Sequence, residues 1–105
     1  MTKYDYYMTL TFNYEYRELK DETKFAILTE FLQKLRRMLP QLRYIVIPSV
    51  MPKGFLHFHL LISGITPQDI KSVSSKDIGD RTYYYVDEWA YGYGTMSKLY
   101  KAVIS

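Results

Sequence analysis

Apolar residues alternate with histidine over residues 55–63, and this pattern constrains the fold more than any other feature of the sequence. The segment reads Phe-Leu-His-Phe-His-Leu-Leu-Ile-Ser, and His57 and His59 are the only histidines in the chain. On a β-strand, residues two apart point to the same face, with Cα atoms about 6.6–6.8 Å apart. The segment therefore predicts a strand with one face in the core and the other face carrying both imidazoles.

Two further strands are expected near this one. Residues 44–48 (Tyr-Ile-Val-Ile-Pro) predict a buried strand, and residues 49–54 predict a loop because they contain proline and glycine. The short loop favours an antiparallel hairpin with the histidine strand. Residues 4–12 alternate at the two-residue period of a first strand, with Thr9 and Thr11 on its hydroxylated face.

One amphipathic helix is expected over residues 21–39. Asp21 is its predicted N-cap, and Pro40 ends it. Apolar residues recur at steps of three and four along one stripe, which is expected to face the core. The stripe consists of Phe25, Leu28, Phe31, Leu32, Leu35 and Leu39. The basic residues on the other face predict a solvated surface that complements the helix dipole.

The remaining segments predict short elements and loops. The expected order is a short helix at residues 66–73, a polar loop at 72–81, a strand at 82–86, a helical turn at 87–91 and a last strand at 93–99. Trp89 is expected to be a core anchor rather than a base-stacking residue. The whole order predicts an α+β domain of ferredoxin-like type, a four- to five-stranded antiparallel sheet with the histidine strand in its centre and helices packed on one face.

Composition fits a single domain over residues 1–105. Hydrophobic residues make up 48% and charged residues 24%, so the chain can build a core. The absence of cysteine excludes disulfides, cysteine-ligated metals and thiol nucleophiles. No apolar run reaches the ~18 residues of a membrane span, so a cytoplasmic protein without a membrane partner is expected. An aromatic content of 17% with a net charge of +3 favours a nucleic-acid partner, although charge argues for partners only weakly.

The two histidines by themselves allow two interpretations. Both imidazoles can converge on one metal ion, or they can line a half-buried sheet without any ligand. Two ligands are too few to define a metal site, so the pair alone leaves the choice open.

Three segments of the chain resemble motifs of the HUH (His-hydrophobic-His) endonucleases, which initiate rolling-circle replication of plasmids and small viruses. Residues 8–12 (Met-Thr-Leu-Thr-Phe) look like the first motif of the replication-initiator (Rep) type, a hydrophobic strand with threonines. Residues 53–62, with Lys-Gly directly before the histidine strand, are similar to the second motif and are the most specific of the three. Residues 89–94 (Trp-Ala-Tyr-Gly-Tyr-Gly) resemble the aromatic and glycine segment before the last strand.

The resemblance implies a Rep-like nuclease domain that binds single-stranded or hairpin origin DNA and nicks it through a tyrosine, giving a 5′-phosphotyrosine and a free 3′-hydroxyl. It also implies that His57 and His59 hold a divalent metal, Mn²⁺ or Mg²⁺, as a Lewis acid at the phosphate. Contacts to the DNA backbone are expected from Thr9, Thr11, Lys53, Lys98 and Lys101. A plasmid, phage or virus is the expected source, and a homodimer would suit paired nicking at an origin.

Two positions depart from the family pattern. Where these proteins usually carry Glu or another polar ligand after a hydrophobic-Pro pair, this chain has Ser49, a weak metal ligand. Residues 97–105 resemble the entrance of the helix that carries the nucleophile, and the sequence stops before the body of that helix. Three alternatives follow: the nucleophile is Tyr100, it lies after Ser105, or the domain has lost cleavage.

Two other functions stay open. A non-catalytic Rep-derived domain that binds nucleic acid or a protein would fit both Ser49 and the short final segment. An RNA-processing ferredoxin-like protein would prefer RNA hairpins over DNA of the same sequence.

Overall fold

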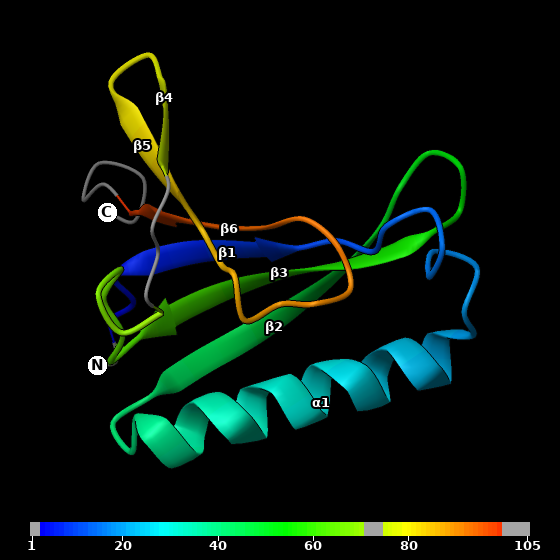
Figure 1. Ribbon diagram of the computed structural model, residues 1–105, viewed down its shortest axis with the longest axis horizontal. Coiled ribbons are helices and arrows are strands. Elements are labelled where there is room, and N and C mark those ends of the chain that lie inside the picture. The colour runs from blue at the N-terminus through cyan, green and yellow to red at the C-terminus, as the bar shows by residue number, and fades with distance from the viewer. Residues whose placement is uncertain (1–2, 71–74, 100–105) are drawn as a thin grey trace.

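One long helix and six β-strands make up the described part of the chain, residues 3–70 and 75–99 of a computed structural model (Figure 1). In chain order the elements are β1 (Tyr6–Leu10), α1 (Asp21–Met38), β2 (Arg43–Val50), β3 (Leu56–Ser63), β4 (Ser75–Ile78), β5 (Arg81–Tyr85) and β6 (Gly94–Lys98). The strands form one antiparallel sheet in the order β2-β3-β1-β6-β5-β4. The α+β class and the antiparallel sheet are confirmed, with six strands instead of four or five.

The histidine strand β3 lies inside the sheet, between β2 and β1. β2 and β3 form the expected antiparallel hairpin, which places Ser49 opposite His57 and Ile47 opposite His59. On the other side of β3, the pairing with β1 places Thr9 opposite His59. β3 is therefore an interior strand, although it is second from the β2 edge rather than central.

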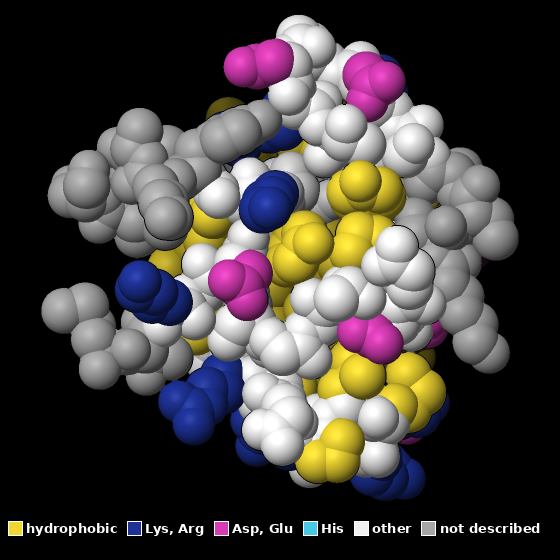
Figure 2. All heavy atoms as spheres, turned by 90° about the vertical axis from the view of Figure 1, so that its left-hand side faces the viewer, with side chains coloured by type: hydrophobic (Ala, Val, Ile, Leu, Met, Phe, Trp, Pro, Cys, Tyr) yellow, Lys and Arg dark blue, Asp and Glu magenta, His cyan; other side chains and the backbone are white. Residues whose placement is uncertain are grey.

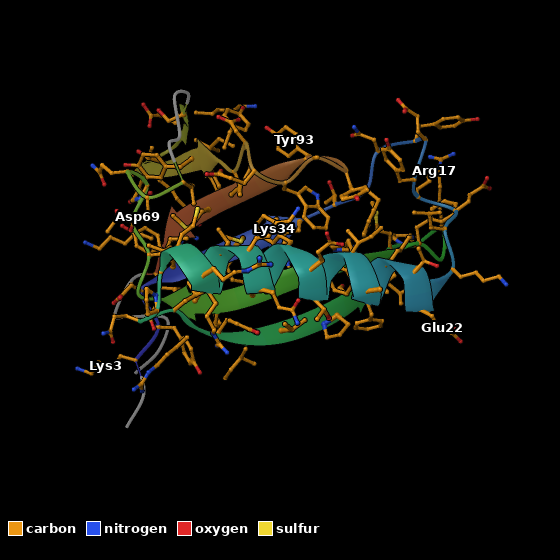
Figure 3. All side chains as sticks on the ribbon, turned by 60° about the horizontal axis from the view of Figure 1, so that its bottom comes forward. Lys3, Arg17, Glu22, Lys34, Asp69 and Tyr93 are labelled. Atoms are coloured by element: carbon orange, nitrogen blue, oxygen red, sulfur yellow. The ribbon has the colours of Figure 1, made fainter. Side chains whose placement is uncertain are left out.

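Helix α1 runs along one face of the sheet (Figure 3). Leu28, Phe31, Leu32 and Leu35 are buried there, as their spacing predicts. Phe25 departs from the predicted stripe because its side chain is 42% exposed. The stripe is thus narrower at its N-terminal end than the apolar pattern indicates.

The first turn of α1 differs from the sequence-based prediction in two respects. Asp21 is the first helical residue, and Lys20 holds the N-cap position without a side-chain hydrogen bond. Asp21 therefore contributes through its charge near the positive end of the helix dipole rather than as a cap. Lys24 is fully buried at this end of the helix, and its Nζ donates to the backbone carbonyls of Arg17 and Leu56.

Side chains from β1 and β3 complete the core. Met8 and Leu10 of β1 are buried together with the even-numbered residues of β3 and the apolar face of α1. Trp89 joins this cluster, and its Nε1 donates to the backbone carbonyl of Thr11 at 2.7 Å. The prediction that Trp89 anchors the core is confirmed.

The segment expected to be a polar loop contains a β-hairpin. β4 and β5 are joined by a tight turn in which Gly79 has a φ of 64°. Every residue of β4 is exposed, so this strand lacks the apolar alternation that marks a half-buried one. Backbone pairing with β5 and a 2.8 Å hydrogen bond from the Thr82 hydroxyl to Asp77 hold it in place.

Three other expected elements are also different. Residues 67–70 and 87–88 form turns rather than helices, and residues 71–73 lie outside the described part of the chain. β2 is an edge strand whose Ile45 and Ile47 are exposed, so it is not the buried strand that its composition predicts. Within residues 3–70 and 75–99, no helix has the length and apolar character needed to cross a membrane.

Candidate functional site

The two histidine side chains meet on the face of the sheet opposite α1. They alternate along β3 with buried core residues such as Phe58, so they project away from the helix. Their Nε2 atoms lie 3.0 Å apart, and the two rings are nearly perpendicular, with an interplanar angle of 84°. Without a ligand, the Nε2–H of one ring donates to the Nε2 of the other. The convergence of both imidazoles on one point is therefore present.

Two residues of β1 hold the ring of His59. Thr9 Oγ1 lies 3.1 Å from His59 Nδ1, and the Tyr7 ring stacks on the imidazole with centroids 5.3 Å apart. When the Thr9 hydroxyl accepts the Nδ1 proton, the Nε2 lone pair of His59 faces His57. Burial, and to a smaller extent the charge of His57, lowers the pKa of His59 below its ordinary value. The neutral form, which is the one that binds metals, is thereby favoured.

This geometry fits two ligands of a single divalent ion. Two nitrogens about 2.1 Å from an ion and at right angles to each other are about 3.0 Å apart. The Nδ1 atom of His57 is buried and makes no hydrogen bond within the described residues. Ser49 stands opposite His57 in the β2–β3 ladder. No cluster of three or more His, Cys, Asp or Glu side chains occurs in residues 3–70 and 75–99, so hydroxyl, water or phosphate oxygens would be the other ligands.

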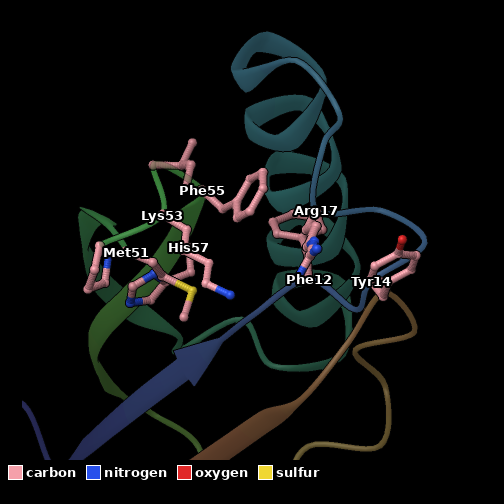
Figure 4. A pocket seen from close by; sticks show the side chains of 9 residues that line it. Phe12, Tyr14, Arg17, Met51, Lys53, Phe55 and His57 are labelled. Carbon is pink, nitrogen blue, oxygen red and sulfur yellow. The ribbon is translucent and has the colours of Figure 1, made fainter.

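A cavity of about 330 Å³ opens beside His57, between the β1–α1 loop and the β2–β3 loop (Figure 4). Its lining includes the aromatic and basic residues Phe12, Tyr14, Arg17, Lys53 and Phe55. The guanidinium carbon of Arg17 lies over two of these rings, 4.5 Å from the centroid of Tyr14 and 4.9 Å from that of Phe55. The histidine pair therefore has a cationic and aromatic cavity on one side.

The residues predicted to contact DNA are placed in different parts of the fold. Thr9 contacts His59 directly, and Lys53 is exposed at the cavity beside His57. The hydroxyl of Thr11 donates to the Tyr93 carbonyl at 2.9 Å and accepts from the Tyr93 N–H at 3.1 Å. Thr11 thus holds the segment before β6 in place.

The remaining predicted residues are not gathered at the histidines. Lys98 pairs with Tyr6 at the end of β6, several ladder positions from Thr9. Figure 2 views the end of the sheet where β1 begins and β6 ends, and none of the described side chains visible there is a histidine. Tyr100 and Lys101 lie outside the described residues.

Three residues of this region were not predicted from the sequence. Tyr7 stands two residues before Thr9, so the two-residue period of the strand could have identified it as a neighbour of the site. Arg17 and Lys24 carry no comparable signal. Their positions depend on how the β1–α1 loop packs against the β2–β3 loop, which local periodicity does not describe.

A family model for replication-associated proteins of the ORF2 type matches residues 5–105 of the chain. No curated protein and no solved structure matches it. The matched range contains the histidine pair, Thr9 and the whole lining of the cavity.

Proposed function

Because the chain belongs to this family of replication-associated proteins, we propose that it is an HUH-type domain of a replication initiator. In this proposal it binds single-stranded or hairpin DNA at the histidine pair and nicks it. The 3.0 Å approach of the Nε2 atoms of His57 and His59 carries the proposal, because it is the separation of two ligands of one ion. The family description itself supports a replication-related role.

His57 and His59 would hold the divalent ion, Mn²⁺ or Mg²⁺, through their Nε2 atoms. Thr9 would keep His59 in the tautomer that leaves this nitrogen free to bind. When bound, the ion supplies Lewis-acid stabilisation of the negative charge that develops on the phosphate oxygens. Manganese suits a shell of mixed imidazole and oxygen ligands.

Cleavage needs a nucleophile, and Tyr100 is the residue proposed for it within this sequence. Its phenolic oxygen would bond to phosphorus while the bond from phosphorus to the 3′-oxygen breaks. The phenolic proton passes to water and the 3′-oxygen takes up a proton, so the products are a 5′-phosphotyrosine and a 3′-hydroxyl. A tyrosine after Ser105 is the alternative nucleophile.

Thermal unfolding tests the metal site. Saturating Mn²⁺ should raise the unfolding midpoint of the wild type, because the ion binds the folded state alone. The His57→Ala/His59→Ala double variant should not respond. Gln33→Ala, on the exposed side of α1, is the control and should respond like the wild type. A wild-type midpoint that Mn²⁺ leaves unchanged would exclude the metal site.

A covalent-adduct assay tests the nuclease reaction. The chain is incubated with Mn²⁺ and labelled single-stranded DNA from its own replicon, and the products are separated on a denaturing gel. An adduct that Tyr100→Phe abolishes would place the nucleophile at Tyr100. An adduct that survives in Tyr100→Phe would exclude this assignment.

DNA binding without cleavage is a second candidate function, and one observation favours it. The position opposite His57 holds Ser49, which gives the histidine pair no third charged ligand. DNA binding on a native gel with no adduct on the denaturing gel would assign this function to the chain.

A further inference from the structure

The cavity between the β1–α1 and β2–β3 loops has the features of a nucleobase site (Figure 4). Its volume of about 330 Å³ lies at the lower end of the range for small-ligand pockets. Met51, Phe55 and Leu56 give it apolar walls, and His57 forms part of its lining. Apolar walls favour a flat aromatic group over a phosphate, which needs polar partners on several sides.

Arg17 supplies the polar group of this cavity. The rings of Tyr14 and Phe55 engage the faces of its guanidinium, so its N–H edge is the part left for a ligand. The Nε atom is buried and has no hydrogen-bond partner within the described part of the chain. A buried N–H of this kind is unfavourable unless an acceptor reaches it.

The backbone around Arg17 is fixed without any ligand. Its N–H donates to the Asn13 carbonyl at 2.9 Å, and its carbonyl accepts from the Nζ of Lys24. The same Nζ donates to the carbonyl of Leu56 at 3.4 Å, which ties the β1–α1 loop to the start of β3. The cavity is therefore formed in advance, which lowers the entropic cost of binding.

We infer that this cavity binds one unstacked guanine of the DNA strand whose phosphate lies at the two histidines. The inference rests on the proposed DNA-binding function. Guanine presents O6 and N7, two neighbouring acceptors that match the paired N–H groups of an arginine edge. Its ring packs against the aromatic wall, and Lys53 in the β2–β3 loop contacts the adjoining phosphate.

Fluorescence anisotropy with three labelled probes tests this inference. The probes are a thymidine oligomer of about twelve nucleotides, the same oligomer with one guanine near its middle, and the same with 7-deazaguanine there. Binding is measured in EDTA, so that recognition is separated from metal binding. The wild type should bind the guanine probe about tenfold more tightly than the thymidine probe, and 7-deazaguanine should lose most of this advantage.

Variants locate the preference. Arg17→Met should abolish the guanine preference and leave the thymidine affinity nearly unchanged. Arg36→Met is the matched control, because the Arg36 guanidinium lies over the Tyr44 ring at 5.1 Å, outside the cavity lining. Tyr14→Leu should weaken the preference, and since Tyr14 is 77% exposed this variant should fold even if Arg17→Met does not. The unfolding midpoint of each variant checks its folding.

Each other outcome rejects the inference in a distinguishable way. Equal wild-type affinity for all probes would leave DNA binding intact and reject guanine recognition alone. An equal loss for all probes in Arg17→Met would show that Arg17 contacts phosphate. Failure of the wild type to bind any probe would reject the DNA-binding function and the guanine site together.

Discussion

Thr9 and His59 face each other across the β1–β3 ladder, with Thr9 Oγ1 at 3.1 Å from His59 Nδ1. This contact links the first strand of the chain to the histidine pair. The opposite ring nitrogen of His59 points to His57, so the position of the threonine hydroxyl governs which nitrogen is free to bind an ion. Thr9 therefore has an orienting role at the site rather than only the DNA contact that its strand position predicts.

Replacing this hydroxyl should weaken metal binding without unfolding the protein. Thr9→Val keeps the branched shape that suits a strand, and loss of an outer-shell hydrogen bond typically lowers metal affinity about 10- to 100-fold. A Mn²⁺ titration followed by the unfolding midpoint measures the change. Thr95→Val is the matched control, because Thr95 lies on β6, where it pairs with Thr9 rather than with a histidine. Wild-type affinity in Thr9→Val would exclude the orienting role.

A carboxylate at position 49 should strengthen metal binding. Ser49 stands opposite His57, so Ser49→Glu adds a charged oxygen ligand next to the imidazole pair. We expect Mn²⁺ affinity to rise by about an order of magnitude, since ligand charge raises affinity for hard cations. Val50→Glu adds the same charge to the exposed neighbouring position, whose side chain points to the other face of β2. If both variants bind alike, the gain comes from net charge and not from ligation.

The histidine strand shows what local periodicity can predict. The two-residue alternation over β3 predicts its buried face, its imidazole face and the convergence of His57 and His59, and all three are present. The pairing of β2 with β3 was equally accessible, because a short loop joins them. These features depend on residues close in sequence, where geometry is nearly fixed by the strand itself.

Features that depend on packing between distant segments could not be predicted in this way. Lys24 is buried while Phe25 is partly exposed, because the helix end packs against the β1–α1 and β2–β3 loops, where backbone carbonyls accept from the lysine. β4 consists of exposed residues and is a strand only through its pairing with β5. In both cases tertiary contacts outweigh the local pattern.

Gly92 is required by a close approach of two backbones. A Cβ at this position would lie 2.2 Å from the Thr11 carbonyl oxygen and 2.8 Å from the Asn13 nitrogen. Gly92→Ala should therefore lower the free energy of unfolding by about 1–3 kcal/mol, the usual cost of overpacking. Urea denaturation measures the loss. Gly79→Asn is the control, since that site is open and its φ of 64° suits asparagine. Equal stability of Gly92→Ala and the wild type would contradict the close approach.

Burial of Lys24 should make stability depend on pH in a defined direction. Desolvation lowers the pKa of Lys24 below its ordinary value of 10.5, and Asp21 opposes this only in part. Between the lowered pKa and 10.5 the unfolded chain binds more protons than the folded one, so the lysine's contribution to stability rises with pH. Lys24→Met leaves the carbonyls of Arg17 and Leu56 without this donor and should cost about 1–3 kcal/mol.

The stability difference between the wild type and Lys24→Met should therefore widen from about pH 8 to about pH 10. Urea denaturation of both proteins across this range measures it. The raised pKa values of Tyr6 and Tyr7 act in the opposite direction near the upper end, because the folded state then binds more protons. Both proteins carry these tyrosines, so the difference cancels their effect. A constant or narrowing difference would mean that the Lys24 ammonium is not destabilised by burial.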